Sequence, residues 1–215
     1  MVDIERIEKR TAQSFYDDGL FEIALGLIFL FLGGLLFVQT AFPQGTWLNT
    51  VFTVLFFIVL VSTGILVGRF VRFFKRRITD RRTGYVAFKK KDSSPKGRVA
   101  TMVVAGIIGA ALASLYGLSP SGRSLFPALA GCLLAVAALG MANKIGLARF
   151  FVLAAASAVI GVAIAAAGVG GIEGVSFYWG LFGIAFIISG LAALIVFLRR
   201  FPRLAADASE GPDAR

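Results

Sequence analysis

The sequence contains no histidine, and its only cysteine is Cys132. Without histidine the chain lacks the commonest general base, metal ligand and pH-sensitive side chain. A single cysteine excludes a disulfide within one chain. The sequence also contains no P-loop, no dinucleotide-binding glycine motif and no zinc-ligand spacing. These absences predict no cofactor and no metal site, and they favour a protein that is not an enzyme.

Charged residues are also scarce, at 16% of the 215 residues, whereas soluble domains carry about a quarter. Hydrophobic residues make up 58%, and the mean hydropathy is +0.84. The charges are bunched between long apolar runs, which is typical of a polytopic membrane protein. The net charge of +10 is then explained by the positive-inside rule and by anionic lipid, so nucleic acid is not the favoured partner.

Six apolar runs are long enough to cross a bilayer as helices. They span residues 19–39, 47–68, 99–117, 126–142, 148–168 and 177–198. The sequence therefore predicts an all-α integral membrane protein in which six transmembrane helices form three hairpins. The fourth run is the shortest, and we retain it as a span because the positive charges after it would otherwise lie on the wrong side.

Lysine and arginine alternate strongly between the segments that connect these runs. From the N-terminus to the C-terminus the segments carry 3, 0, 12, 1, 2, 0 and 4 of them. Short loops with this bias set the orientation of a membrane protein. We therefore expect a multi-pass protein of a bacterial-type inner (plasma) membrane, with the N-terminus and the C-terminus in the cytoplasm.

This topology divides the chain into five parts. They are a cytoplasmic amphipathic segment (1–18), the first transmembrane hairpin (19–68), a basic cytoplasmic insert (69–98), a four-helix transmembrane unit (99–198) and a cytoplasmic tail (199–215). The basic insert contains GYVAF at 84–88, whose aromatic and β-branched residues predict one short strand-like segment. No second strand pattern exists to pair with it, so it pairs with another chain or lies on the membrane.

Small residues recur at four-residue spacing on two of the expected helices. One stripe is Ala105, Gly109 and Ala113, and the other is Ser157, Gly161 and Ala165. Such stripes let helix backbones approach closely. We expect a close-packed 99–198 unit, with the first hairpin more peripheral or at an oligomer interface. A coding bias towards alanine and glycine is the alternative explanation.

Three carboxylates, Asp17, Asp18 and Glu22, stand where the first span begins. They are candidates for binding a substrate or an ion such as Mg²⁺, which prefers oxygen ligands. The structural alternative is stronger. Asp17 or Asp18 suits a helix N-cap, acids complement the helix dipole, and Glu22 is placed to pair with Arg69 or Arg72.

The basic insert is the candidate surface for lipid or a partner protein. The residues proposed for this contact are Arg69, Arg72, Lys75, Arg76, Arg77, Arg81, Arg82, Tyr85, Phe88, Lys89, Lys90 and Lys91. Anionic lipid attracts each base near the surface by about 1 kcal/mol. Nucleic acid is the less favoured partner, and a role in orientation alone is the simplest alternative.

These features lead to two main hypotheses about function. The first is a non-enzymatic polytopic membrane protein, homo-oligomeric, whose basic cytoplasmic segment contacts anionic lipid or a partner protein. The second is a small-solute or ion transporter or channel with an acidic cytoplasmic mouth at Asp18 and Glu22. An enzyme is supported only by the cluster of Asp17, Asp18 and Glu22, and the rest of the chain supplies no second acidic set.

Overall fold

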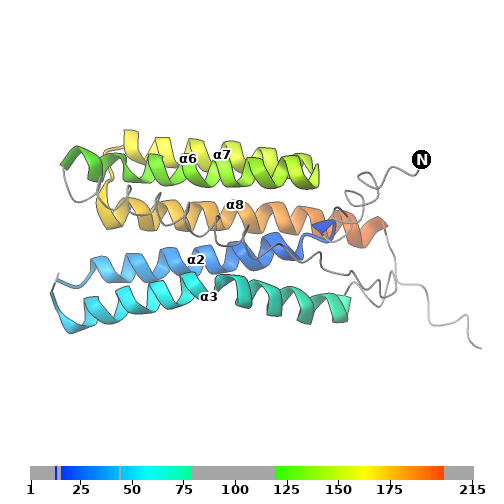
Figure 1. Ribbon diagram of the computed structural model, residues 1–215, viewed down its shortest axis with the longest axis horizontal. Coiled ribbons are helices and arrows are strands. Elements are labelled where there is room, and N and C mark those ends of the chain that lie inside the picture. Colours follow the sequence, from blue (N-terminus) through cyan, green and yellow to red (C-terminus); the bar gives the residue numbers. More distant parts are fainter. Residues whose placement is uncertain (1–12, 14–15, 44, 79–119, 201–215) are drawn as a thin grey trace, which may run out of the picture.

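The computed structural model describes residues 13, 16–43, 45–78 and 120–200, and these form a bundle of long helices (Figure 1). In chain order the helices are α2 (Leu20–Thr40), α3 (Trp47–Ile78), α6 (Pro120–Ile145), α7 (Ala148–Ala166) and α8 (Gly171–Arg200). All five are long and apolar enough to cross a membrane. The chain is therefore a multi-pass membrane protein.

The helices agree in position with five of the six expected spans. They extend beyond the apolar runs at several ends, most of all in α3, which continues through Arg69 to Ile78. The remaining run, 99–117, and the strand-like segment 84–88 lie outside the described residues.

Helices that follow one another in the described chain do not always alternate in direction. In Figure 1, α2 and α7 run one way, while α3, α6 and α8 run the other way. Consequently α3 finishes at the end of the bundle opposite to the one where α6 begins. The chain between Ile78 and Pro120 connects these two ends.

Glycines bring α2 and α8 into close contact along their length. Gly19 lies against Gly190, Gly26 against Gly183, and Gly33 against Gly180. A Cβ added to Gly26 would lie 2.7 Å from the carbonyl oxygen of Gly183. Only a hydrogen atom fits between these backbones. A glycine at every seventh residue of this segment therefore allows α2 and α8 to pack closely.

The contact with α8 makes α2 a central helix. Of the apolar stretch of α2, 44% of residues are buried, against 6% for α3, which packs mainly on α2. The expectation of a peripheral first hairpin is therefore wrong for α2, and it describes α3 well. The physical reason is the glycine face of α2, which lets α8 approach, whereas α3 carries bulky Phe, Val and Ile residues outward.

The second close contact joins α6 and α7. Gly161 lies against Gly131, with their Cα positions so near that an added Cβ would come within 3.0 Å. Ser157 donates a hydrogen bond of 2.8 Å to the Gly131 carbonyl and lies 2.7 Å from the Tyr178 hydroxyl. Ala165, on the same stripe, is half-buried. The other stripe, Ala105, Gly109 and Ala113, lies outside the described residues.

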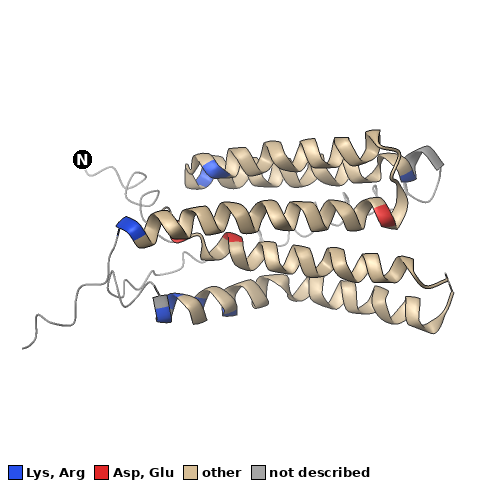
Figure 2. Cartoon of the chain, turned by 180° about the vertical axis from the view of Figure 1, so that it is seen from behind, with Lys and Arg blue, Asp and Glu red and all other residues tan. Residues whose placement is uncertain are grey.

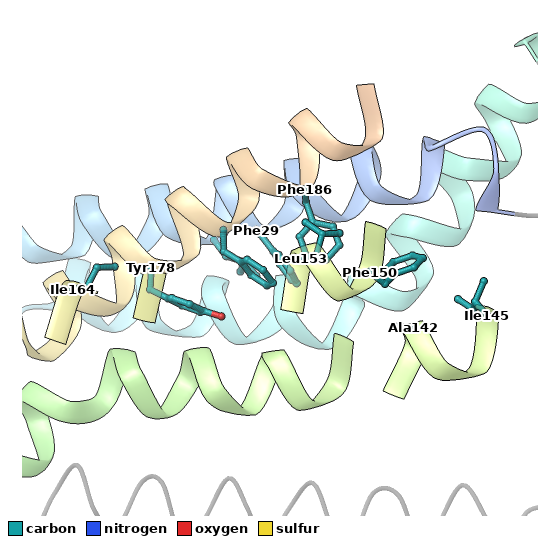
Figure 3. Close-up of a cluster of buried hydrophobic side chains, with 10 residues drawn as sticks. Phe29, Ala142, Ile145, Phe150, Leu153, Ile164, Tyr178 and Phe186 are labelled. Carbon is teal, nitrogen blue, oxygen red and sulfur yellow. The ribbon is translucent and has the colours of Figure 1, made fainter. Parts of the chain in front are cut away.

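An aromatic core fills the space between α2, α7 and α8 (Figure 3). On α8 the rings of Tyr178, Phe182 and Phe186 follow one another at four-residue spacing. Phe29 of α2 packs on Phe182 and Phe186, with centroid distances of 5.7 and 5.6 Å. Phe150 at the start of α7 extends the same cluster. This core anchors the first turn of α7 against α2, which places the charged residues described next.

Candidate functional site

Basic side chains gather at one end of the bundle, called here the basic end (Figure 2). At this end α2 and α7 begin, and α3, α6 and α8 finish. The described basic residues there are Arg69, Arg72, Lys75, Arg77, Lys144, Arg149, Arg199 and Arg200. Arg123 and the acid Glu173 stand at the opposite end, where α6 and α8 begin. The charge asymmetry expected from the sequence is thus present between the two ends of the described bundle.

Asp18 ties the start of α2 to the end of α3. The chain turns at Gly19, whose φ of 67° favours glycine, and the Leu20 N–H donates to Asp18 Oδ1 at 3.3 Å. Lys75 Nζ lies 3.3 Å from the other carboxylate oxygen, and the Asp18 side chain is 1% exposed. The expected N-cap at Asp17 or Asp18 is wrong, because Gly19 occupies that position without a side-chain cap. Asp18 accepts from the first backbone N–H of α2 and forms one half of an inter-helix ion pair.

Glu22 ties α2 to the start of α7. Its side chain is fully buried, and its Oε1 lies 2.8 Å from Arg149 Nε. The geometry is that of an ion pair without a hydrogen bond, because neither carboxylate oxygen has a hydrogen-bond partner in the described part of the chain. The expected pairing of Glu22 with Arg69 or Arg72 is wrong. Both arginines lie on α3, whereas Arg149 enters from α7 beside the first turn of α2.

Arg149 is held by a second contact. Its guanidinium donates a hydrogen bond to the backbone carbonyl of Tyr16, just before α2. Burial, and to a smaller extent the charge of Glu22, raises the pKa of the Tyr16 phenol above its usual value, so the ring remains neutral. Gln13 adds a contact of 3.3 Å to the Gly146 carbonyl in the turn between α6 and α7. These polar contacts join the start of α2 and the residues just before it to α3, to α7 and to the turn between α6 and α7.

The three carboxylates singled out in the sequence do not share one site. Asp18 and Glu22 point into separate ion pairs, while Asp17 is exposed. Within the described ranges, no group of three His, Cys, Asp or Glu side chains comes together as a metal site would require. Asp17 instead lines a pocket of about 360 Å³, together with Arg149 and residues of α8 that include Ser189 and Arg200.

The end of α3 presents alternating basic and aromatic side chains. Arg72 Nε donates to the Gly68 carbonyl at 3.0 Å, and the Arg77 guanidinium lies 4.8 Å from the centroid of Phe73. The rings of Phe70 and Phe74 pack beside them, tilted against each other with their centroids 4.4 Å apart. Such interleaving suits the headgroup boundary, where stems and rings remain apolar and charges reach water. The Arg76 side chain and the residues from Arg81 to Lys91 lie outside the described part.

Sequence reasoning did not single out Arg149 as a partner of Glu22. The sequence gives little sign of this pairing, because Arg149 is a single basic residue at the start of an apolar run. Only the packing of α7 beside the start of α2 reveals the pair. Comparison with protein-family models, curated proteins and solved structures finds no match for this chain.

Proposed function

We propose that this is a non-enzymatic membrane protein, homo-oligomeric, whose basic end faces the cytoplasm and binds anionic lipid headgroups. The membrane would be a bacterial-type inner membrane, with both chain termini on its cytoplasmic side. The carrying observation is the gathering of basic side chains at one end of a bundle of apolar helices. Positive residues remain on the cytoplasmic side during insertion, and that leaflet carries anionic lipid.

The end of α3 supports a lipid contact at this level. Arg69, Arg72 and Arg77 are exposed, and Phe73 beside them is 53% exposed. A basic surface that also exposes aromatic rings fits the boundary between headgroups and acyl chains. The homo-oligomer is supported by the outward apolar face of α3, where Val54, Phe57 and Val61 are each more than half exposed.

A sixth span between α3 and α6 belongs to the same proposal. It is supported by the direction of the helices, because α3 finishes at the basic end and α6 begins at the opposite end. An odd number of crossings between Ile78 and Pro120 satisfies this arrangement. The apolar run 99–117 would be about 28 Å long as a helix, close to the roughly 30 Å hydrocarbon core of a bilayer.

A transporter or channel that uses Asp18 and Glu22 at its mouth has less support from the geometry. Both side chains are buried and face basic partners on other helices. A carboxylate engaged in this way holds helices together and is not presented to a passing ion. We therefore place these two residues in the scaffold.

The lipid proposal is tested by thermal unfolding of the purified protein in neutral detergent. Added phosphatidylglycerol should raise the unfolding midpoint more than added phosphatidylcholine, because a ligand that binds only the folded state stabilises it. The variant with Arg69, Arg72 and Arg77 replaced by glutamine should lose most of this difference. Arg123→Gln, at the opposite end, serves as the control and should retain it.

Equal midpoints with the two lipids would contradict the proposal. So would a phosphatidylglycerol effect that persists unchanged in the triple variant. Native mass spectra of the same samples report the oligomeric state. A monomer at every protein concentration would contradict the proposed homo-oligomer.

A further inference from the structure

The pocket at the basic end lies between the start of α2, the first turn of α7 and the last turns of α8. Its volume is about 360 Å³. Asp17, Arg149 and Arg200 give it charged walls, and Ala192, Ala193 and Val196 give it an apolar wall. It therefore combines both signs of charge with an apolar surface.

Two of its charges have no ion-pair partner among the described residues. Asp17 and Arg200 are both exposed, and neither takes part in an ion pair with another described side chain. Arg149 is held by Glu22 and by the Tyr16 carbonyl. Because a guanidinium carries five N–H donors, these contacts leave donors for a ligand. An acid and a base that face one pocket suit a ligand that also carries both charges.

The apolar wall shows that such a ligand would need a tail. The lining residues Ser189 and Arg200 are separated along α8 by about 16 Å at 1.5 Å per residue. Val196 between them is 61% exposed and faces outward. In a bilayer this face of α8 meets acyl chains, and Arg200 at the end of α8 meets headgroups.

We propose that this pocket binds a phospholipid whose headgroup carries a primary ammonium, that is, a phosphoethanolamine lipid. Arg149 and Arg200 would hold the phosphate, since arginine forms strong, charge-assisted hydrogen bonds with phosphate oxygens. Asp17 would accept from the ammonium group. The site is distinct from the basic surface of α3, and the ligand has no net charge, so the inference goes beyond the binding of anionic lipid.

Native mass spectrometry with two lipids of identical acyl chains tests this site. Phosphatidylethanolamine and phosphatidylcholine are both net neutral, so general attraction to a basic surface does not separate them. Only the first has an ammonium that can donate hydrogen bonds. The full-length protein should retain phosphatidylethanolamine about fivefold better, the ratio that about one surface charge contact provides.

Substitutions assign the preference to the pocket. Asp17→Asn should remove the preference for phosphatidylethanolamine, and Arg200→Gln should weaken the retention of both lipids by about fivefold. Arg199→Gln, the neighbouring base that does not line the pocket, is the matched control and should leave both unchanged. Val196→Trp should fill the pocket and reduce retention, whereas Ile195→Trp, on an exposed position outside it, should not.

Equal retention of the two lipids by the unmodified protein would overturn the proposal. It would also be overturned if Asp17→Asn kept the preference for phosphatidylethanolamine and if Arg200→Gln and Val196→Trp left the retention of both lipids unchanged. Both results are independent of whether phosphatidylglycerol stabilises the protein, so the anionic-lipid proposal can stand or fall separately.

Discussion

At the scale of single residues, the pair Glu22–Arg149 is the contact whose loss we expect to matter most. Glu22 is fully buried, and Arg149 is its only ion-pair partner among the described residues. Removal of one partner from a buried pair leaves an uncompensated charge, which costs about 3–5 kcal/mol. Arg149→Met should therefore lower the free energy of unfolding by about 3 kcal/mol, near the lower limit because Arg149 is partly exposed.

The measurement is unfolding in mixed micelles, with two comparisons. Lys144→Met, an exposed base near the same end, should change the free energy of unfolding by less than about 0.5 kcal/mol. The double variant Glu22→Gln with Arg149→Met removes both charges and should regain most of the loss. If Arg149→Met costs no more than Lys144→Met, the pair does not stabilise the fold.

At this scale, the sequence does not say which basic residue pairs with each buried carboxylate. The acidic cluster and its role in ion pairing were readable, because Asp18 and Glu22 stand at the start of an apolar run. Their partners Lys75 and Arg149 come from α3 and α7, far along the chain. From the sequence alone, several arginines could pair with Glu22, and only the tertiary packing selects Arg149.

At the scale of elements, glycine spacing determines how α2 and α8 meet. The neighbouring glycines Gly33 and Gly34 provide a matched test. A Cβ on Gly33 would lie 2.7 Å from the backbone nitrogen of Gly180, whereas Gly34 has nothing within 4 Å. Gly33→Ala should therefore lower the free energy of unfolding by about 1–3 kcal/mol, as overpacking does.

Gly34→Ala should leave stability unchanged or raise it by up to about 1 kcal/mol, because alanine favours the helix more than glycine does. Both variants are compared by the same micellar unfolding assay. Equal effects of the two substitutions would show that α2 and α8 do not approach as closely as the structure places them.

The α2–α8 contact could have been read only in part from the sequence. Gly19, Gly26 and Gly33 are spaced by seven residues, and so are Ser176, Gly183 and Gly190. A search for four-residue spacing does not find them. The spacing alone also does not say which two helices meet, or that they are antiparallel, so the pairing required the structure.

At the scale of the whole molecule, hydropathy predicted the helices well, because a bilayer requires long apolar runs whatever their tertiary contacts. Five expected spans correspond to α2, α3, α6, α7 and α8. The relative packing was less predictable, since lipid-facing and helix-facing positions are both apolar. That is why α2, rich in Phe and Leu, was expected at the periphery although it lies at the centre.

The proposed sixth span makes a prediction about sidedness that concerns the entire chain. If the segment between α3 and α6 crosses once, Ser93 and Ser121 lie on opposite sides of the membrane. In a Cys132→Ala background, Ser121→Cys should react with a membrane-impermeant maleimide in intact spheroplasts. Ser93→Cys should react only after the membrane is permeabilised.

Gly45→Cys, in the connection between α2 and α3, is the control for the outer side. Asn143→Cys, exposed at the basic end of α6, is the control for the inner side. Reaction of Ser93→Cys and Ser121→Cys from the same side would mean an even number of crossings between α3 and α6. Because α3 and α6 run in the same direction, that result would also contradict the arrangement of the helices in Figure 1.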